Sequence, residues 1–210
     1  MNSLKKLASF CEQFTTPPSG VLCQMERETH LKTLAPQMMC GPLQGQFLSL
    51  LSRLVQPRQI LEIGTFTGYA AICLAQGLRP GGTLHTIEAN PEYSHISRKY
   101  FEKTGMRDSI VLHEGDAKII VPTLAGSFDI VYIDAGKNEN ALYYDLIFDR
   151  VERGGFIITD NVLWSGKVLS KATDRDTRDI GVFNQKVHDD ERVENIMLPI
   201  RDGILLARKL

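Results

Sequence analysis

From about residue 58 to the C-terminus, short apolar runs alternate with stretches of helical character. Five of these runs are apolar along most of their length rather than at every second position: QILEIG, TLHTIEA, SIVLHEG, FDIVYID and GFIITDN. Strands that are apolar on both sides are typical of a parallel sheet covered by helices on both faces. The pattern therefore predicts an α/β fold in which strands and helices alternate.

The two ends of the chain depart from this alternation. Residues 1–56 lack convincing strands, and their apolar spacing predicts three helices at about 2–14, 20–35 and 43–55. Two further runs near the C-terminus, RVENIMLPI and DGILLARKL, are separated by a short turn, so we expect an antiparallel hairpin. A mostly parallel seven-stranded sheet closed by such a hairpin favours a Rossmann-like, class I methyltransferase-type fold over a dehydrogenase fold. No repeat or linker interrupts the chain, which predicts a single domain, 1–210, in which segment 1–56 packs on a core of 57–210.

Composition narrows the range of partners. A net charge of −1, with scattered Lys and Arg, gives no electrostatic reason to bind nucleic acid or an anionic membrane. The four cysteines form no CxxC pair and the five histidines form no HExxH motif, which argues against structural zinc. No apolar stretch is long enough for a signal peptide or a membrane span, so we expect a cytoplasmic protein.

The turn after the first strand, in LEIGTFTGYA, lacks the GxGxxG pattern of dinucleotide-binding proteins, because threonines stand where a pyrophosphate needs glycine. Acidic residues nevertheless occur at three successive strand ends, as Glu62, Glu88 and Asp116. Each alone is more often a solvated residue or a helix cap. Together they would line one crevice, because the carboxyl ends of strands in an open α/β sheet meet there. This arrangement favours a nucleoside without a pyrophosphate, such as S-adenosylmethionine.

Two more strands end in oxygen-bearing side chains. Asp134 follows the fourth strand, with Lys137 three residues later, and Asp160-Asn161 ends the fifth. If these strands are neighbours, Asp134, Asp160 and Asn161 supply three hard oxygen ligands, which suit Mg²⁺, Mn²⁺ or Ca²⁺ rather than zinc. Asp-Asn taken alone is more commonly turn chemistry.

An octahedral cation with three protein ligands has about three open positions, and a vicinal diol could occupy two of them. A phenolic hydroxyl, with a pKa of about 10, is a poor nucleophile at neutral pH. A cation favours the phenolate, and Lys137 is placed to receive the proton as general base. The alternative for Lys137 is a solvated loop lysine.

The stretch from about Met38 to the C-terminus resembles the cation-dependent class I O-methyltransferases, the family of catechol and caffeoyl-coenzyme A O-methyltransferases. The motifs that carry the resemblance are MMCGPLQGQFLSLL, LEIGTFTGYA, EGDA, YIDAGK, ITDNVLWSGKV, DTRDIGVFN and DGILLARK. The resemblance implies a divalent-cation site at Asp134, Asp160 and Asn161, the catalytic base Lys137 and a homodimer. It implies S-adenosylmethionine contacts at Met38, Glu62, Gly64, Thr65, Gly68, Glu88, Asp116, Ala117 and Asp134. For Met38, a core-filling role is the equal alternative.

The chain departs from the family pattern at three positions. Gly136 and Asn140 replace an aspartate and a tyrosine common in relatives, and Ala70 replaces a serine that helps to hold the cofactor carboxylate. These changes bear on acceptor identity and cofactor affinity but not on the cation ligands.

The leading hypothesis is therefore an S-adenosylmethionine-dependent O-methyltransferase acting on a small catechol or hydroxycinnamoyl-type phenolic acceptor. An N-methyltransferase is disfavoured because no Asn/Asp-Pro-Pro-aromatic motif follows the fourth strand, and an NAD-dependent oxidoreductase because GxGxxG is absent. A catalytically weak module that binds S-adenosylmethionine is the non-enzymatic alternative.

Overall fold

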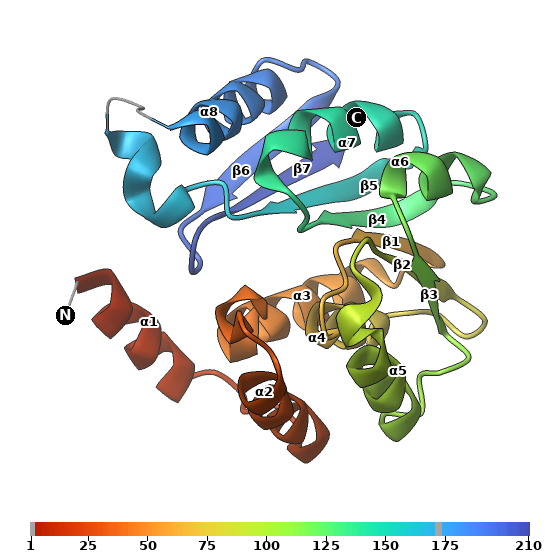
Figure 1. Ribbon diagram of the computed structural model, residues 1–210. Coiled ribbons are helices and arrows are strands. Elements are labelled where there is room, and N and C mark those ends of the chain that lie inside the picture. Colours follow the sequence, from red (N-terminus) through yellow and green to blue (C-terminus); the bar gives the residue numbers. More distant parts are fainter. Residues whose placement is uncertain (1–2, 171–173) are drawn as a thin grey trace.

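The computed structural model describes residues 3–170 and 174–210. A seven-stranded sheet with the order β3-β2-β1-β4-β5-β7-β6 forms the centre of the molecule (Figure 1). The strands are β1 (Gln59–Ile63), β2 (Thr83–Glu88), β3 (Ile110–Glu114), β4 (Phe128–Ile133), β5 (Val151–Asp160), β6 (Val193–Leu198) and β7 (Ile204–Lys209). β1 to β5 pair in parallel, and β7 lies antiparallel between β5 and β6. The predicted mostly parallel sheet with a C-terminal hairpin is confirmed.

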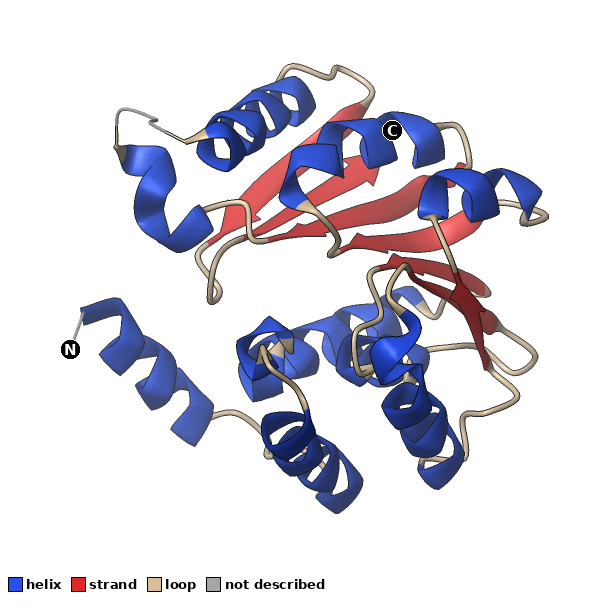
Figure 2. Cartoon of the chain, viewed as in Figure 1, coloured by secondary structure: helices blue, strands red, loops and turns tan. Residues whose placement is uncertain are grey.

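Helices form a layer on each face of this sheet (Figure 2). One layer contains α1 (Ser3–Gln13), α2 (Gly20–Lys32), the short η1 (Pro36–Met38), α3 (Gly41–Val55), α4 (Tyr69–Ala75), η2 (Pro91–Tyr93) and α5 (Ser94–Lys103). The other contains α6 (Ala117–Ile120), η3 (Val121–Thr123), η4 (Lys137–Glu139), α7 (Asn140–Phe148), η5 (Trp164–Leu169) and α8 (Arg175–His188).

The three predicted N-terminal helices are present with shifted ends. Residue 2, where the first was expected to begin, lies outside the described residues. The second ends at Lys32 rather than at 35, because Thr33 is extended (φ −118°, ψ 151°) and Pro36 disfavours helical backbone in the residue before it. Among the described residues, no helix has the length and apolar character needed to cross a bilayer.

Neighbouring residues of the central strands belong to different hydrophobic cores. Ile60 and Tyr132 pack with α2, α3, α4 and α5, whereas Leu61 and Val131 pack with α6, α7 and α8. Successive side chains of a strand point to opposite faces, and both faces are covered here. This two-sided burial is the physical reason why the strand sequences are apolar without alternation.

The strand register brings the functional segments together. Ile63 at the end of β1 pairs with Ile133 at the end of β4, which in turn pairs with Thr159 of β5. The residues that follow these three therefore leave the sheet side by side, at its carboxyl edge. This edge is where open α/β sheets bind their ligands.

Candidate functional site

A cavity of about 700 Å³ lies at the carboxyl edge of the sheet. Its walls come from the segment around η1, the β1–α4 turn, the ends of β2, β4 and β5, and the β6–β7 turn. Nine of the predicted site residues line it: Met38, Gly64, Thr65, Glu88, Ala117, Asp134, Lys137, Asp160 and Asn161. Glu62, Gly68 and Asp116 are not among its lining residues.

The β1–α4 turn owes its shape to two glycines. Gly64 has a φ of +101°, and a Cβ there would lie 2.1 Å from the Asp134 carbonyl oxygen, so the chain leaving β1 passes too close to the end of β4 for any other residue. Gly68 has a φ of +92°, and its absent Cβ would lie 2.7 Å from the Phe101 ring. Gly64 thus forms the cavity wall, whereas Gly68 lies behind it and packs against α5.

Two of the three predicted acidic residues differ sharply in their surroundings. Glu88 lines the cavity, and its carboxylate accepts hydrogen bonds from the backbone N–H of Phe66 at 2.6 Å and of Asn90 at 2.8 Å. Glu62 is fully buried, and its Oε2 accepts a 2.5 Å hydrogen bond from Thr86. Burial raises the pKa of the Glu62 carboxyl well above its usual range.

The third acid, Asp116, lies near the rim of the cavity. Its carboxylate caps α6 by accepting a hydrogen bond from the Lys118 N–H at 2.8 Å, and its side chain is 41% exposed. Its neighbours Gly115 and Ala117 line the cavity. The expected row of three acids along one crevice is therefore represented at the cavity wall by Glu88, and the cofactor contacts of Glu62, Gly68 and Asp116 stay predictions.

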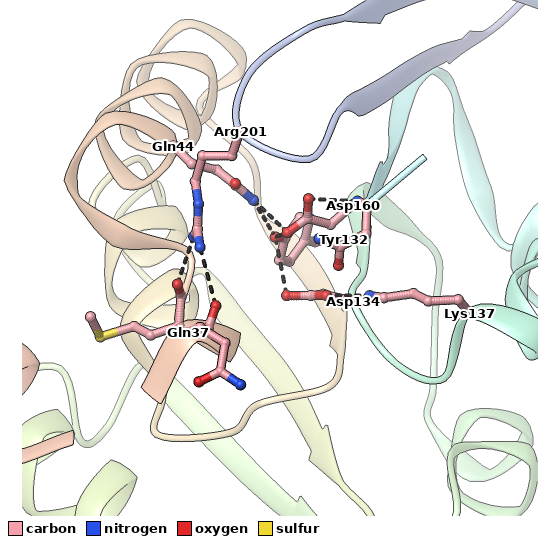
Figure 3. A network of polar contacts seen from close by, with 9 residues as sticks. Gln37, Gln44, Tyr132, Asp134, Lys137, Asp160 and Arg201 are labelled. Carbon is pink, nitrogen blue, oxygen red and sulfur yellow. Dashed lines mark hydrogen bonds and ion pairs between the residues drawn. The ribbon is translucent and has the colours of Figure 1, made fainter. Parts of the chain in front are cut away.

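The carboxylate and amine that end the fourth strand form an ion pair. Lys137 Nζ lies 2.7 Å from Asp134 Oδ1, and both side chains are more than four-fifths buried. The short η4 begins at Lys137 and turns its side chain back towards the strand end (Figure 3). Both residues line the cavity, so this pair faces any bound ligand.

Asp160 accepts three hydrogen bonds at the site (Figure 3). It is 3% exposed; its Oδ1 accepts from the Asn161 N–H at 2.6 Å, and its Oδ2 accepts from Gln44 Nε2 at 2.7 Å and from Tyr132 Oη at 3.0 Å. Burial, followed by repulsion from Asp134, raises the pKa of Asp160 above its usual range. Asn161 has a φ of +60°, which directs the chain sharply away from the strand.

The two predicted carboxylate ligands converge. Tyr132 Oη lies 3.0 Å from Asp160 Oδ2 and 3.5 Å from Asp134 Oδ2, so the two carboxylates cannot be farther apart than these two distances together. Within residues 3–170 and 174–210 no group of three or more His, Cys, Asp or Glu side chains is arranged to hold a metal ion. The predicted set has two carboxylates and one amide, a combination of oxygen donors that fits a small hard cation.

Several residues of the site were missed by the sequence analysis. Gln44 on α3 and Tyr132 on β4 are fully buried and bind Asp160. Arg201, in the β6–β7 turn, donates to the carbonyl oxygens of Met39 at 2.6 Å and Gln37 at 3.2 Å, and so ties this turn to the segment that carries Met38. The only sequence signal was a polar residue within the apolar stripe of a helix, at Gln44.

A family model described as O-methyltransferase matches residues 13–210. The chain belongs to the O-methyltransferase family. The predicted membership of the S-adenosylmethionine-dependent, class I O-methyltransferases is confirmed.

Among relatives, the catechol O-methyltransferase of Mycobacterium tuberculosis is 37% identical over 142 residues, 67% of this chain and 64% of that protein. Caffeoyl-CoA O-methyltransferase 1 of Eucalyptus globulus is 34% identical over 179 residues, 80% of this chain and 73% of that protein. The match thus spans slightly less than two thirds of the mycobacterial relative.

Solved structures agree with the fold over nearly the whole chain. The Podospora anserina methyltransferase PaMTH1, bound to S-adenosylhomocysteine (SAH), has a TM-score of 0.90 at 27% identity, with 100% of this chain and 97% of that chain covered. The Bacillus cereus O-methyltransferase, in complex with SAH, has a TM-score of 0.88 at 29% identity, with 98% and 97% covered.

Proposed function

We propose that this O-methyltransferase binds S-adenosylmethionine and moves its methyl group to a hydroxyl of a small catechol or hydroxycinnamoyl-type acceptor, assisted by a divalent cation. The family membership, the SAH in two similar structures and the names of the relatives support this proposal. The observation that carries it is the convergence of Asp134, Lys137 and Asp160 at one cavity wall.

The cofactor part of the proposal rests on the cavity wall built by β1, β2 and the residue after β3. Glu88 would accept the ribose hydroxyls, because two backbone N–H groups already hold its carboxylate in one orientation. Gly64 and Thr65 would let the methionine part approach the backbone, with Met38 and Ala117 as flanking contacts. Glu62 would act from behind the wall, through the Thr86 and Thr65 hydroxyls, which lie 2.5 Å apart.

The cation would be held by Asp134, Asp160 and Asn161, and when bound it would favour the phenolate form of the acceptor and fix its orientation. Lys137 pairs with Asp134 as an ammonium; beside a bound divalent cation it would release that proton to solvent, and the neutral amine would then take the hydroxyl proton as general base. The adjacent Asp134 carboxylate, 2.7 Å away, would stabilise the ammonium that results. Methyl transfer is an in-line displacement, so the main task of the cavity is to hold oxygen, methyl and sulfur in near-attack geometry.

An assay of methyl transfer from S-adenosylmethionine to caffeate or 3,4-dihydroxybenzoate tests the proposal. We expect transfer that EDTA abolishes and Mg²⁺ restores. Full activity in chelator would disprove the cation role.

Cofactor binding without methyl transfer would instead favour the second candidate function, a module that only binds S-adenosylmethionine. Two residues of the cavity wall support this candidate. Ala70 and Gly136 both line the cavity and bring neither a hydroxyl nor a carboxylate to it.

The homodimer and the cytoplasmic location expected from the sequence belong to the proposal as well. Light scattering of the purified protein tests whether it is a dimer.

A further inference from the structure

One oxygen of Asp160 is held by two neutral donors from different elements. Gln44 reaches it from α3 at 2.7 Å and Tyr132 from β4 at 3.0 Å, and neither side chain has any exposed surface. Gln44 Nε2 also donates to Tyr132 Oη at 2.8 Å, so the three side chains form a closed set (Figure 3).

The donors and acceptors of this set can be assigned without conflict. The Gln44 amide has two hydrogens, one for Tyr132 Oη and one for Asp160 Oδ2. The single Tyr132 proton then goes to Asp160, 3.0 Å away, rather than to Asp134 at 3.5 Å. Oδ2 of Asp160 is therefore fully occupied, and only Oδ1, which accepts from the Asn161 N–H, retains a free lone pair.

Folding alone does not require these polar groups. Gln44 Oε1 is buried and has no hydrogen-bond partner, an arrangement that costs stability. Tyr132 belongs to an apolar core cluster, and its neighbours in β4, Val131 and Ile133, are aliphatic. Apolar side chains would fill both positions, so the contacts to Asp160 are the feature that needs an explanation.

We propose that Gln44 and Tyr132 are positioning residues that hold the Asp160 carboxylate by one oxygen and leave the other for a divalent cation. This inference rests on the proposed function. A carboxylate that can offer only one oxygen suits the six-coordinate Mg²⁺ or Mn²⁺ ion, whereas Ca²⁺ readily takes carboxylates through both oxygens. The pair would therefore favour the smaller ions over Ca²⁺.

Titration with Mn²⁺ alone, followed by electron paramagnetic resonance of the free ion, tests this role. We expect Tyr132→Phe and Gln44→Leu each to weaken Mn²⁺ binding about 10-fold and the double variant up to about 100-fold, as for other groups that orient metal ligands. Competition with Mg²⁺ and Ca²⁺ should show a shift of preference towards Ca²⁺ in each variant.

Two matched controls separate positioning from general loosening. Tyr144→Phe removes an equally buried hydroxyl that donates to Asp190 at 3.0 Å, and Gln46→Leu changes the next glutamine of α3; neither residue lines the cavity. Both should bind Mn²⁺ within twofold of the wild type. Circular dichroism and thermal melting of every variant check that the fold is retained. If the Gln44 variants do not fold, Tyr132→Phe alone tests the positioning role.

The outcomes distinguish this inference from the proposed function. If Asp160→Asn abolishes Mn²⁺ binding while Tyr132→Phe and Gln44→Leu bind as the wild type does, only the positioning role is overturned. Weaker binding with an unchanged Mg²⁺ to Ca²⁺ preference, or an equal loss in Tyr144→Phe, also overturns it. A wild-type protein that binds no Mn²⁺ would remove both the cation site and its positioning.

Discussion

At the scale of single residues, Asp160 separates the two functions of the cavity. Its carboxylate contacts Gln44, Tyr132 and Asn161, and none of its hydrogen bonds reaches the cofactor wall around Glu88. We therefore expect Asp160→Ala to lower turnover by about 100-fold or more, because a cation contributes several kcal/mol to this chemistry. Cofactor affinity, measured by calorimetry with S-adenosylhomocysteine, should stay within a few fold.

An equal loss of turnover and cofactor affinity would contradict a separate role for Asp160. Asp174→Ala provides a control, because this carboxylate caps the exposed start of α8 through Thr177 and does not line the cavity. That variant should retain both turnover and affinity.

At the scale of elements, the close approach of the β1 and β4 ends depends on Gly64. An added Cβ would lie 2.1 Å from the Asp134 backbone, so Gly64→Ala should push the two strand ends apart and lower the free energy of unfolding by about 3 kcal/mol, the sum of this clash and of the strain at a φ of +101°. Gly81→Ala is the matched control: its φ of +77° is as unfavourable for alanine, but nothing lies within 4 Å of the added carbon. It should cost about 1 kcal/mol.

Urea unfolding of both variants measures this difference. Equal costs would mean that backbone strain, and not the close approach of the two strand ends, is what requires glycine at position 64.

A second element-scale contact joins α2 to α5 and depends on pH. Glu28 lies 2.8 Å from Lys32 and 2.5 Å from Lys99, and it accepts a hydrogen bond from Tyr100 at 2.8 Å. These partners lower the pKa of Glu28 from its ordinary 4.5 to about 2. Because the folded-state pKa is depressed, the stabilisation is complete above about pH 4.5 and is lost as the pH falls towards 2.

Glu28→Gln should accordingly reduce the free energy of unfolding at pH 7 by about 1 kcal/mol, since both lysine partners are exposed and solvent screens their charges. The difference from the wild type should shrink in urea titrations at pH 4, 3 and 2.5. Glu102→Gln on α5, the helix that carries Lys99, is the control: Glu102 is 71% exposed and lies 3.8 Å from Arg107, so its substitution should change little at any pH. A difference for Glu28→Gln that stays constant down to pH 2.5 would contradict this account.

At the scale of the whole molecule, the sheet was predictable because the sequence patterns that specify it lie within single short segments of the chain. Strands buried on both faces carry unbroken apolar runs, and a short turn between the last two runs dictates a hairpin. The convergence of Asp134 and Asp160 was predictable as well, because both residues end neighbouring parallel strands, β4 and β5. The contacts of Gln44 and Arg201 were not predictable. They depend on how α3 and the β6–β7 turn pack against the sheet, and no pattern within these segments specifies that packing.

The cavity draws its walls from both halves of the sheet, so a bound cofactor should stabilise the molecule as one unit. At 100 times its dissociation constant, S-adenosylhomocysteine should add about 2.7 kcal/mol to the free energy of unfolding. For a chain of 210 residues, this gain in the free energy of unfolding corresponds to a rise of about 5–10 °C in Tm. NAD at the same concentration should give no rise, because the turn after β1 lacks the GxGxxG pattern that lets the backbone approach a pyrophosphate. Glu88→Ala should reduce the shift at a fixed ligand concentration, since its carboxylate is the acid that reaches the cavity wall from β2. A full shift in that variant, or an equal shift with NAD, would mean that the nucleoside is held elsewhere.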